Sequence, residues 1–262
     1  MLAPLSKSLS SPPLKIPFTL RREREFLYLK EVDLVIAATQ NTRAAMRNCA
    51  LAQLFFCQAL QPIELSWLRC CDVDFHKNTL QVIRNRTQSS RRQPLSVNRQ
   101  WLSIAEVDLL KELQHYRTTD WLVESERKQR LSERSLHHII ASAGVCAQLR
   151  FPVHPYMLRR TGLYYRAALL LEPLGLSLRQ CCLLWNLHLT SSSLSAQEEI
   201  EYHTILRRQE EGFLNALERM KTFSGITAFD NVADYLLGAF LLFPRLQGIP
   251  QNYWLAPRNW TI

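Results

Sequence analysis

The chain has 262 residues, of which 32 are lysine or arginine and 23 are aspartate or glutamate, so its formal net charge at pH 7 is +9. Hydrophobic residues make up 47% of the chain, which excludes a disordered protein and provides a core for one large domain with tails, or for one domain with a small appendage. The positive charge suits a polyanionic partner such as nucleic acid, and it equally suits simple solubility.

The sequence predicts a cytoplasmic protein without metal and without a membrane segment. Its seven cysteines fall mostly in apolar runs and include no Cys-x-x-Cys pair, which indicates reduced thiols rather than a zinc site. Residues 1–24 form a flexible, basic, Ser/Pro-rich tail without the apolar core of a secretion signal. The apolar segment at residues 235–243 has roughly half the length that a membrane span needs.

In the first half of the chain, apolar periodicity predicts short helices and then a β-hairpin. Residues 29–38 and 44–60 have helical spacing, and Pro62 is placed to begin a third, short helix. From Asp72 onwards apolar and polar residues alternate, break at a polar tip and resume at Pro94, which predicts a hairpin. Its basic residues either form a solvated tip or contact a DNA backbone. They are Arg84, Arg86, Arg91 and Arg92.

Helices dominate the prediction for the second half. Ser103 with Glu106 forms a capping box that opens a helix running through Tyr116, and residues 121–123 are a possible strand. Further helices are expected to begin near residues 132, 155 and 177. A second capping box, at residues 195–198, opens a long helix that carries Tyr202 and is expected to run to Met220. Residues 224–262 are either a small terminal subdomain or a segment that docks on another protomer.

The segment HPYMLRRTG, residues 154–162, has the chemistry of a phosphate site. Arg159 lies at the start of an apolar helix, where its planar guanidinium and the helix dipole both favour a phosphate. The alternative is a surface arginine beside Arg160. Breaking a phosphodiester without metal also requires a nucleophile and a proton donor, and the hydroxyl of Tyr202 supplies a possible nucleophile. That tyrosine is equally consistent with an ordinary residue of an amphipathic helix.

Together these segments resemble the catalytic domain of the tyrosine recombinase, or phage integrase, family, over residues 25–207. Ile63-Glu64-Leu65, Leu68 and the run from Asp72 to Phe75 match the family's box I and the strand that follows it. His154-Pro155, Met157-Leu158-Arg159 and Thr161 match its box II. The layout is most similar to the short fimbrial-switch recombinases, which lack a separate core-binding domain.

The resemblance implies a mainly α fold with a small antiparallel β-sheet, the integrase catalytic-domain fold, over residues 25–223. The tail at residues 1–24 precedes this domain, and an apolar extension at residues 224–262 follows it. The resemblance also implies a set of catalytic positions, which this chain matches only in part. The first arginine falls on Gln61, the hairpin lysine on Arg86 or its neighbour Arg84, the box II histidine on Tyr156, the second arginine on Arg159, the later histidine on Leu187 with His188 beside it, and the nucleophile on Tyr202.

These replacements weaken the catalytic set. Glutamine carries no charge to stabilise the transition state, and the loss of one such group commonly costs about 10²-fold or more in rate. Arginine holds its proton too tightly to act as a general acid. The departures favour a DNA-binding regulator or accessory factor that cleaves DNA weakly or not at all.

The alternative is an active site-specific recombinase that cleaves and rejoins DNA through a 3′-phosphotyrosyl intermediate, without ATP, metal or another cofactor. In both cases the expected partner is double-stranded DNA, with a homo-oligomer possible on it, so that the protein associates with the nucleoid and not with a membrane. The expected DNA contacts are Arg84, Arg86, Arg91, Arg92 and Arg160. A third class, a structural protein that kept the fold without DNA binding, is distinguished by the salt dependence of DNA affinity.

Overall fold

The computed structural model describes residues 24–84, 96–189, 193–243 and 246. The first part of the chain folds into helices around a small sheet. Its elements are α2 (Leu29–Thr39), α3 (Ala45–Cys57), α4 (Pro62–Ser66), the 3-10 turn η1 (Cys70–Asp72), β1 (Val73–Asp74), β2 (Thr79–Arg84), β3 (Ser96–Trp101), α5 (Ile104–Tyr116) and α6 (Glu133–Cys146). The second part is helical. Its elements are α7 (Pro155–Leu171), the turn η2 (Glu172–Leu174), α8 (Leu178–Leu189), α9 (Ala196–Tyr202), α10 (Arg207–Ser224) and α11 (Phe229–Leu242).

The predicted fold class, mainly α with a small antiparallel sheet, is confirmed. The three strands lie in the order β1-β2-β3 and pair antiparallel, with Val82 opposite Asn98 and Arg84 opposite Ser96. The predicted hairpin is therefore present as β2 and β3. Its tip, with Arg86, Arg91 and Arg92, lies outside the described residues. The possible strand at residues 121–123 is reduced to a single bridge between Trp121 and Arg69.

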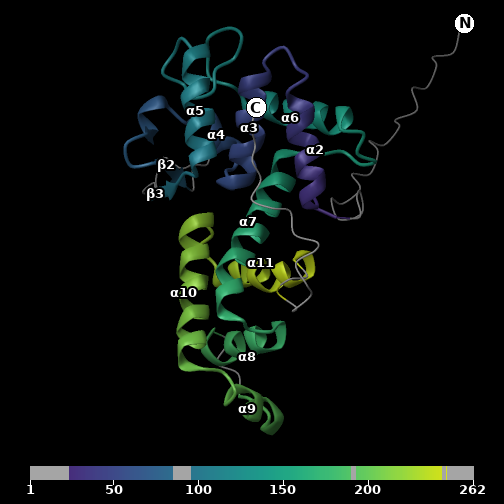
Figure 1. Cartoon of the computed structure of the whole chain (residues 1–262), viewed down its shortest axis with the longest axis vertical. Helices are drawn as coiled ribbons and strands as arrows, with labels where there is room; N and C mark the ends of the chain where they lie inside the picture. The colour runs from purple at the N-terminus through teal and green to yellow at the C-terminus, as the bar shows by residue number, and fades with distance from the viewer. Residues whose placement is uncertain (1–23, 85–95, 190–192, 244–245, 247–262) are drawn as a thin grey trace, which may run out of the picture.

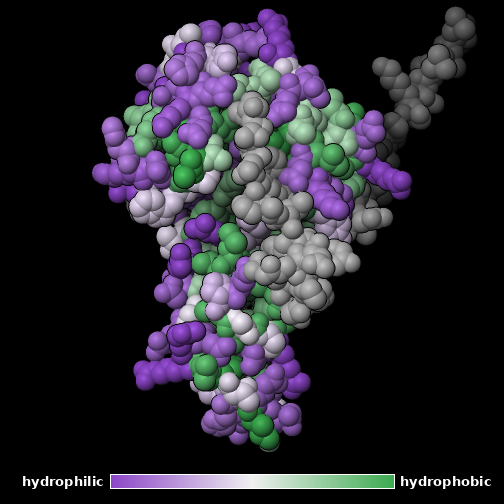
Figure 2. Space-filling view, in the orientation of Figure 1, coloured by the Kyte–Doolittle hydropathy of each residue, from purple (hydrophilic) through white to green (hydrophobic). Residues whose placement is uncertain are grey.

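Two hydrophobic cores share α7. Figure 1 shows this helix running from the part that contains the sheet into the helical part with α8, α10 and α11. The first core lies among α2 to α6 and the sheet, and includes Met157 and Leu158 from the start of α7. The second lies among the later part of α7 and α8, α10 and α11, and includes Leu163 and Leu171. Figure 2 shows hydrophilic residues along the outer edges of the molecule and hydrophobic ones concentrated towards the middle of this face. Because α7 contributes to both cores, the position of α10 relative to the sheet depends on it.

The long helix expected to carry Tyr202 is in fact two helices. α9 ends at Tyr202, where the hydroxyl of Thr204 donates to the carbonyl of Glu201 at 2.6 Å. α10 then begins after Leu206, whose backbone N–H donates to the side chain of Gln209 at 3.0 Å. These local hydrogen bonds compete with helix continuation, and the prediction of one helix to Met220 was wrong.

Residues of the C-terminal segment pack on their own chain. α11 buries Val232, Leu236 and Phe240 in the second core, and the ring of Tyr235 lies 5.1 Å from that of Tyr164 on α7. Among the described residues, no single helix is both long and apolar enough to cross a bilayer. Two successive helix pairs reach the length and hydropathy of a membrane span only when their two helices are counted together. They are α7–η2 with α8, bent by 96°, and α10 with α11, bent by 110°.

We expect Gly162→Ala to destabilise the protein strongly, because a Cβ at Gly162 would lie 1.9 Å from the carbonyl oxygen of Phe56 on α3. The atom met belongs to the backbone, so the two helices must separate, and we expect the loss in the free energy of unfolding to be about 3 kcal/mol or more, at or above the upper end of the range typical of overpacking. Gly175→Ala is the control: a Cβ there meets nothing within 4 Å, and only its positive φ of 62° adds strain, worth about 1–2 kcal/mol. Urea unfolding curves measure both variants, and equal losses would contradict the close packing of α3 on α7.

Candidate functional site

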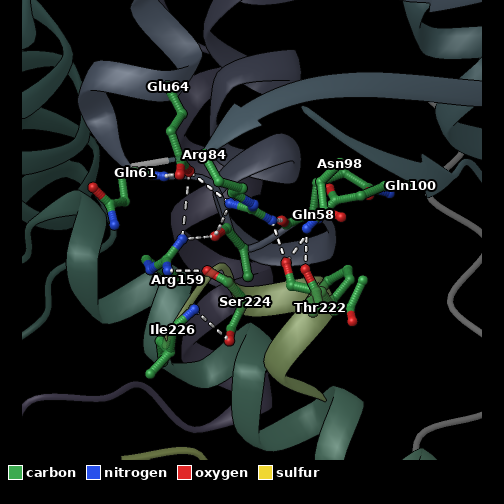
Figure 3. A network of polar contacts seen from close by, with 12 residues as sticks. Gln58, Gln61, Glu64, Arg84, Asn98, Gln100, Arg159, Thr222, Ser224 and Ile226 are labelled. Carbon is green, nitrogen blue, oxygen red and sulfur yellow. Dashed lines mark hydrogen bonds and ion pairs between the residues drawn. The ribbon is translucent and has the colours of Figure 1, made fainter. Parts of the chain in front are cut away.

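Glu64, Arg84 and Arg159 form a buried ionic cluster where the sheet meets α4 and α7 (Figure 3). One carboxylate oxygen of Glu64, Oε2, accepts from Nη1 of Arg84 at 2.6 Å and lies 3.5 Å from Nη1 of Arg159. The same oxygen accepts from the backbone N–H of Gln61 at 2.7 Å, so the carboxylate also caps the first turn of α4. Relative exposure is 3% for Glu64, 0% for Arg84 and 6% for Arg159. We call Arg84 and Arg159 the arginine pair.

Backbone carbonyls from the C-terminal end of α10 cover the arginine pair. Arg159 Nη2 donates to the carbonyl of Ser224 at 2.8 Å, and Arg84 Nη2 donates to the carbonyl of Phe223. From β3, Gln100 donates to the same Phe223 carbonyl at 3.0 Å, and Asn98 donates to that of Thr222. We call residues 222–225 the α10 end. Figure 3 shows it pointing at the arginine pair from the side opposite Glu64.

A glycine at the end of α10 allows the close contact between the α10 end and Arg84. Gly225 caps α10 in the left-handed conformation, with φ 70°, and a Cβ at this position would lie 2.8 Å from Cδ of Arg84. Glycine therefore meets both the backbone requirement of the cap and the close approach of the arginine. The Gly225 position lets the last carbonyls of α10 reach the guanidinium groups.

The electrostatics explain why a helix C-terminus lies here. Two guanidinium groups share one carboxylate, which leaves an excess of one positive charge in a buried place. Burial, together with the positive charge of Arg159, lowers the pKa of Arg84 to about 10, although the carboxylate of Glu64 acts in the opposite direction. Burial also lowers the pKa of Arg159. At neutral pH Arg84 nevertheless stays charged. The C-terminal end of a helix carries a partial negative charge, so the α10 end supplies what the single carboxylate lacks.

The tyrosine predicted as nucleophile lies at the other end of α10. The hydroxyl of Tyr202 donates to Oε1 of Glu210 at 3.1 Å, and Nε2 of His188 bonds to the same oxygen. Glu210 lies in the first turn of α10 and Ser224 is its last residue, 14 residues later, so the two sites are about 21 Å apart along the helix axis. The structure brings Tyr202 and His188 together but does not bring either to Arg159 within one chain.

The surroundings of Tyr202 also weaken it as a nucleophile. Partial burial, then the hydrogen bond to Glu210 and the charge of that carboxylate, raise the pKa of the Tyr202 phenol. A raised pKa lowers the fraction of phenolate at neutral pH. In this conformation Tyr202 serves as a hydrogen-bond donor at the edge of the second core.

The other predicted positions are dispersed around the start of α7. Tyr156 is 42% exposed, and its ring lies 6.0 Å from that of His137 and 6.3 Å from that of His154. Burial, then the nearby charge of Glu133, raises the pKa of Tyr156. Arg160 is exposed, and its predicted DNA contact stays a prediction.

One predicted DNA contact departs from expectation. Arg84 was expected at a basic hairpin tip, but it is fully buried in the ionic cluster and does not face solvent. The reason is its register: Arg84 pairs with Ser96 and points to the face of the sheet that the α10 end covers. Arg86, Arg91 and Arg92 fall outside the described residues, so their predicted contacts stay predictions.

Sequence reasoning missed the partners that close the site. Asn98 and Gln100 look like polar strand residues, and backbone carbonyls have no signature in a sequence. The one available signal was Gly225, placed where a helix ending needs a left-handed residue. In the part of the chain that the structure describes, no group of three or more His, Cys, Asp or Glu side chains could hold a metal ion.

Most of this chain is similar to known proteins in sequence or in structure. The sequence profile of the phage integrase family matches residues 25–165. The type 1 fimbriae regulatory protein FimB of Escherichia coli K12 is 27% identical over 145 residues, which cover 53% of this chain and 70% of FimB. The XerA recombinase structure matches with a TM-score of 0.56 at 15% identity, over 91% of this chain and 70% of that one.

A second solved structure is similar and contains DNA. The Tn1549 transposon integrase in complex with circular intermediate DNA matches with a TM-score of 0.55 at 9% identity, over 82% of this chain and 63% of that one. At these identities the structural likeness shows the fold. The family profile, which matches residues 25–165, and the XerA structure, which matches 91% of the chain, indicate the same catalytic-domain fold.

Glu64→Gln is expected to lower the free energy of unfolding by about 3–5 kcal/mol, because it removes the carboxylate between two buried guanidinium groups and leaves their charges uncompensated. Glu126→Gln is the matched control. Its side chain is 60% exposed and pairs with Arg43 at 3.5 Å, so we expect a change of about 0–1 kcal/mol. Denaturant unfolding measures both, and similar values for the two variants would show that the cluster is not a buried ionic site.

Glu210→Gln is expected to lower the pKa of Tyr202. The substitution removes a carboxylate that accepts a hydrogen bond from the phenol and repels the phenolate. Ultraviolet titration of phenolate formation, compared with the same titration in a Tyr202→Phe background, isolates this one group. An unchanged titration of Tyr202 would contradict the contact with Glu210.

Proposed function

Because the chain belongs to the phage integrase family, we propose that it binds double-stranded DNA as a member that cleaves strands weakly or not at all and acts as a regulator or accessory factor. One observation carries the proposal. The arginine that the family uses to hold the scissile phosphate, Arg159, donates instead to the backbone of the same chain. The carbonyls of Ala59 and of Ser224 in the α10 end take the N–H groups that would otherwise be offered to a phosphate.

The cost of opening this site argues against efficient cleavage. A DNA phosphate could take the N–H groups of Arg159 only if these gave up the carbonyls of Ala59 and Ser224, which would leave buried polar groups to be paired again. Even then the first arginine of the family is Gln61, and an uncharged side chain stabilises the transition state less well. The hydroxyl of Tyr202 would also have to come from about 20 Å away.

DNA binding is supported by charge and by the relatives. The chain carries a formal charge of +9, which attracts a polyanion. The Tn1549 integrase was solved in complex with DNA, and FimB bears the name of a regulatory protein. A fold of this kind with the ionic cluster closed can keep DNA affinity without the reaction, because contacts to other phosphates of the backbone supply affinity and position the DNA.

An active recombinase is the second candidate, and the position of α9 favours it. α9 is short, contacts mainly α8 and lies at one extremity of the molecule, as Figure 1 shows. A tyrosine on such a helix can be delivered to the site of another protomer on DNA. That mechanism still requires the α10 end to leave the arginine pair.

The test is incubation with duplexes from the gene's own neighbourhood, including suicide substrates nicked near candidate sites, followed by native and denaturing gels. We expect retarded DNA without a covalent adduct, for the wild type and for Tyr202→Phe alike. Tyr116→Phe, which alters a tyrosine that is 65% exposed on α5, is the control. An adduct that the wild type and Tyr116→Phe form, and that Tyr202→Phe lacks, would establish the recombinase instead. DNA affinity that does not change with salt would support a protein that kept only the fold.

A further inference from the structure

A second cationic site lies next to the closed one, in a hollow of about 320 Å³ between β3, α7 and α10. Arginines from all three elements line it: Arg99 from β3, Arg166 from α7 and Arg219 from α10. Phe223, whose carbonyl covers the arginine pair, forms part of its wall. The hollow is therefore continuous with the α10 end but does not include Arg84 or Arg159.

The three guanidinium groups differ in their exposure to solvent. Arg99 and Arg219 are exposed, whereas Arg166 is half-buried, with its guanidinium carbon 5.0 Å from the centre of the Phe223 ring. Stacking on an aromatic ring restricts a guanidinium while leaving its N–H groups free to bind in the ring plane. Arg166 is thus held in place before any ligand arrives, and the long side chains of Arg99 and Arg219 line the same hollow from β3 and α10.

The charge balance of the hollow favours an anion. Three arginines and one carboxylate, Glu218, line it, which leaves an excess of two positive charges. Burial and then the positive charge of Arg219 lower the pKa of Arg166, so these two cations repel one another. Arginine stays charged at neutral pH all the same, and an anion between the two would remove the repulsion.

The other lining groups suit a phosphate that belongs to a nucleic acid. Asn98 and Thr222 add polar groups to the wall. Trp101 also lines the hollow and is 71% exposed, which gives a flat apolar surface beside the cations for a sugar or a base. Arg99 and Trp101 lie on the same strand as Asn98, directly after the hairpin segment whose sequence contains Arg86, Arg91 and Arg92.

We propose that Arg99, Arg166 and Arg219 hold one phosphate of the DNA backbone in this hollow, as a binding site separate from the arginine pair. The inference rests on the proposed function for the identity of the ligand. The site replaces, for binding alone, the phosphate contact that Arg159 no longer offers. It positions DNA without reading its sequence, as phosphate contacts do.

The test uses Arg99→Gln/Arg219→Gln, which removes the two exposed arginines and keeps Arg166 as a reporter. Arg127→Gln/Arg150→Gln removes the same charge from two exposed arginines that do not line the hollow. Thermal unfolding checks that both variants are folded. In the first measurement, inorganic phosphate is titrated while the Nε–H signal of Arg166 is followed by NMR. We expect a saturable shift in the wild type and the control, and its loss in the Arg99/Arg219 variant.

The second measurement is the affinity for a labelled duplex of mixed sequence over a range of salt concentrations. Loss of one phosphate contact reduces the slope of log affinity against log salt by about 0.9, and we expect this change in the Arg99/Arg219 variant and not in the control. A wild type whose Arg166 signal shows no saturable shift would overturn the proposal, as would an unchanged slope in the variant. A wild type that binds phosphate but no DNA would overturn the proposed function and leave an anion site for a free phosphate.

Discussion

The arrangement of this protein depends on the carboxylate of Glu64, which lies between the guanidinium groups of Arg84 and Arg159. This one side chain joins α4 to β2 and to α7, and its second role is to cap the first turn of α4. A lone carboxylate cannot neutralise two buried cations, so the cluster needs a further source of negative charge. The C-terminal carbonyls of α10 provide it, and the ionic cluster thereby fixes where the helical half of the molecule meets the sheet.

The same contact underlies the proposal that this chain cleaves DNA weakly or not at all. A helix end and a phosphate both offer several oxygens with negative charge, so two arginines suited to one can be satisfied by the other. Here the oxygens belong to the chain itself, and Arg159 becomes a residue that holds α10 against the sheet. By resemblance, the position of the family's first arginine falls on Gln61. This residue carries no charge, so it adds no third cation next to Glu64, whose carboxylate accepts from its backbone N–H.

α10 also sets the distance between the two predicted halves of a catalytic site. Its end binds the arginine pair, and its first turn holds Tyr202 and His188 through Glu210. A single straight helix cannot bring its two ends together, so within one chain the tyrosine and the arginine stay about 20 Å apart. Two exposed arginines, Arg99 and Arg219, line the hollow beside the α10 end. The proposed phosphate site and the predicted nucleophile therefore lie at opposite ends of the same helix.

The sequence by itself determined whatever depends on neighbouring residues. Alternation predicted the β2–β3 hairpin, the spacing of Ser103 and Glu106 predicted a capping box that the structure contains, and the motifs around Glu64 and Arg159 predicted the fold. Only the tertiary structure decided that α9 and α10 separate after Tyr202 and that Arg84 points inwards. It also decided that the carbonyls of Phe223 and Ser224 accept from the arginine pair. The physical reason is that caps and alternation are carried by side chains at fixed spacing, whereas a backbone carbonyl is the same at every position and gains its role only from what the fold places beside it.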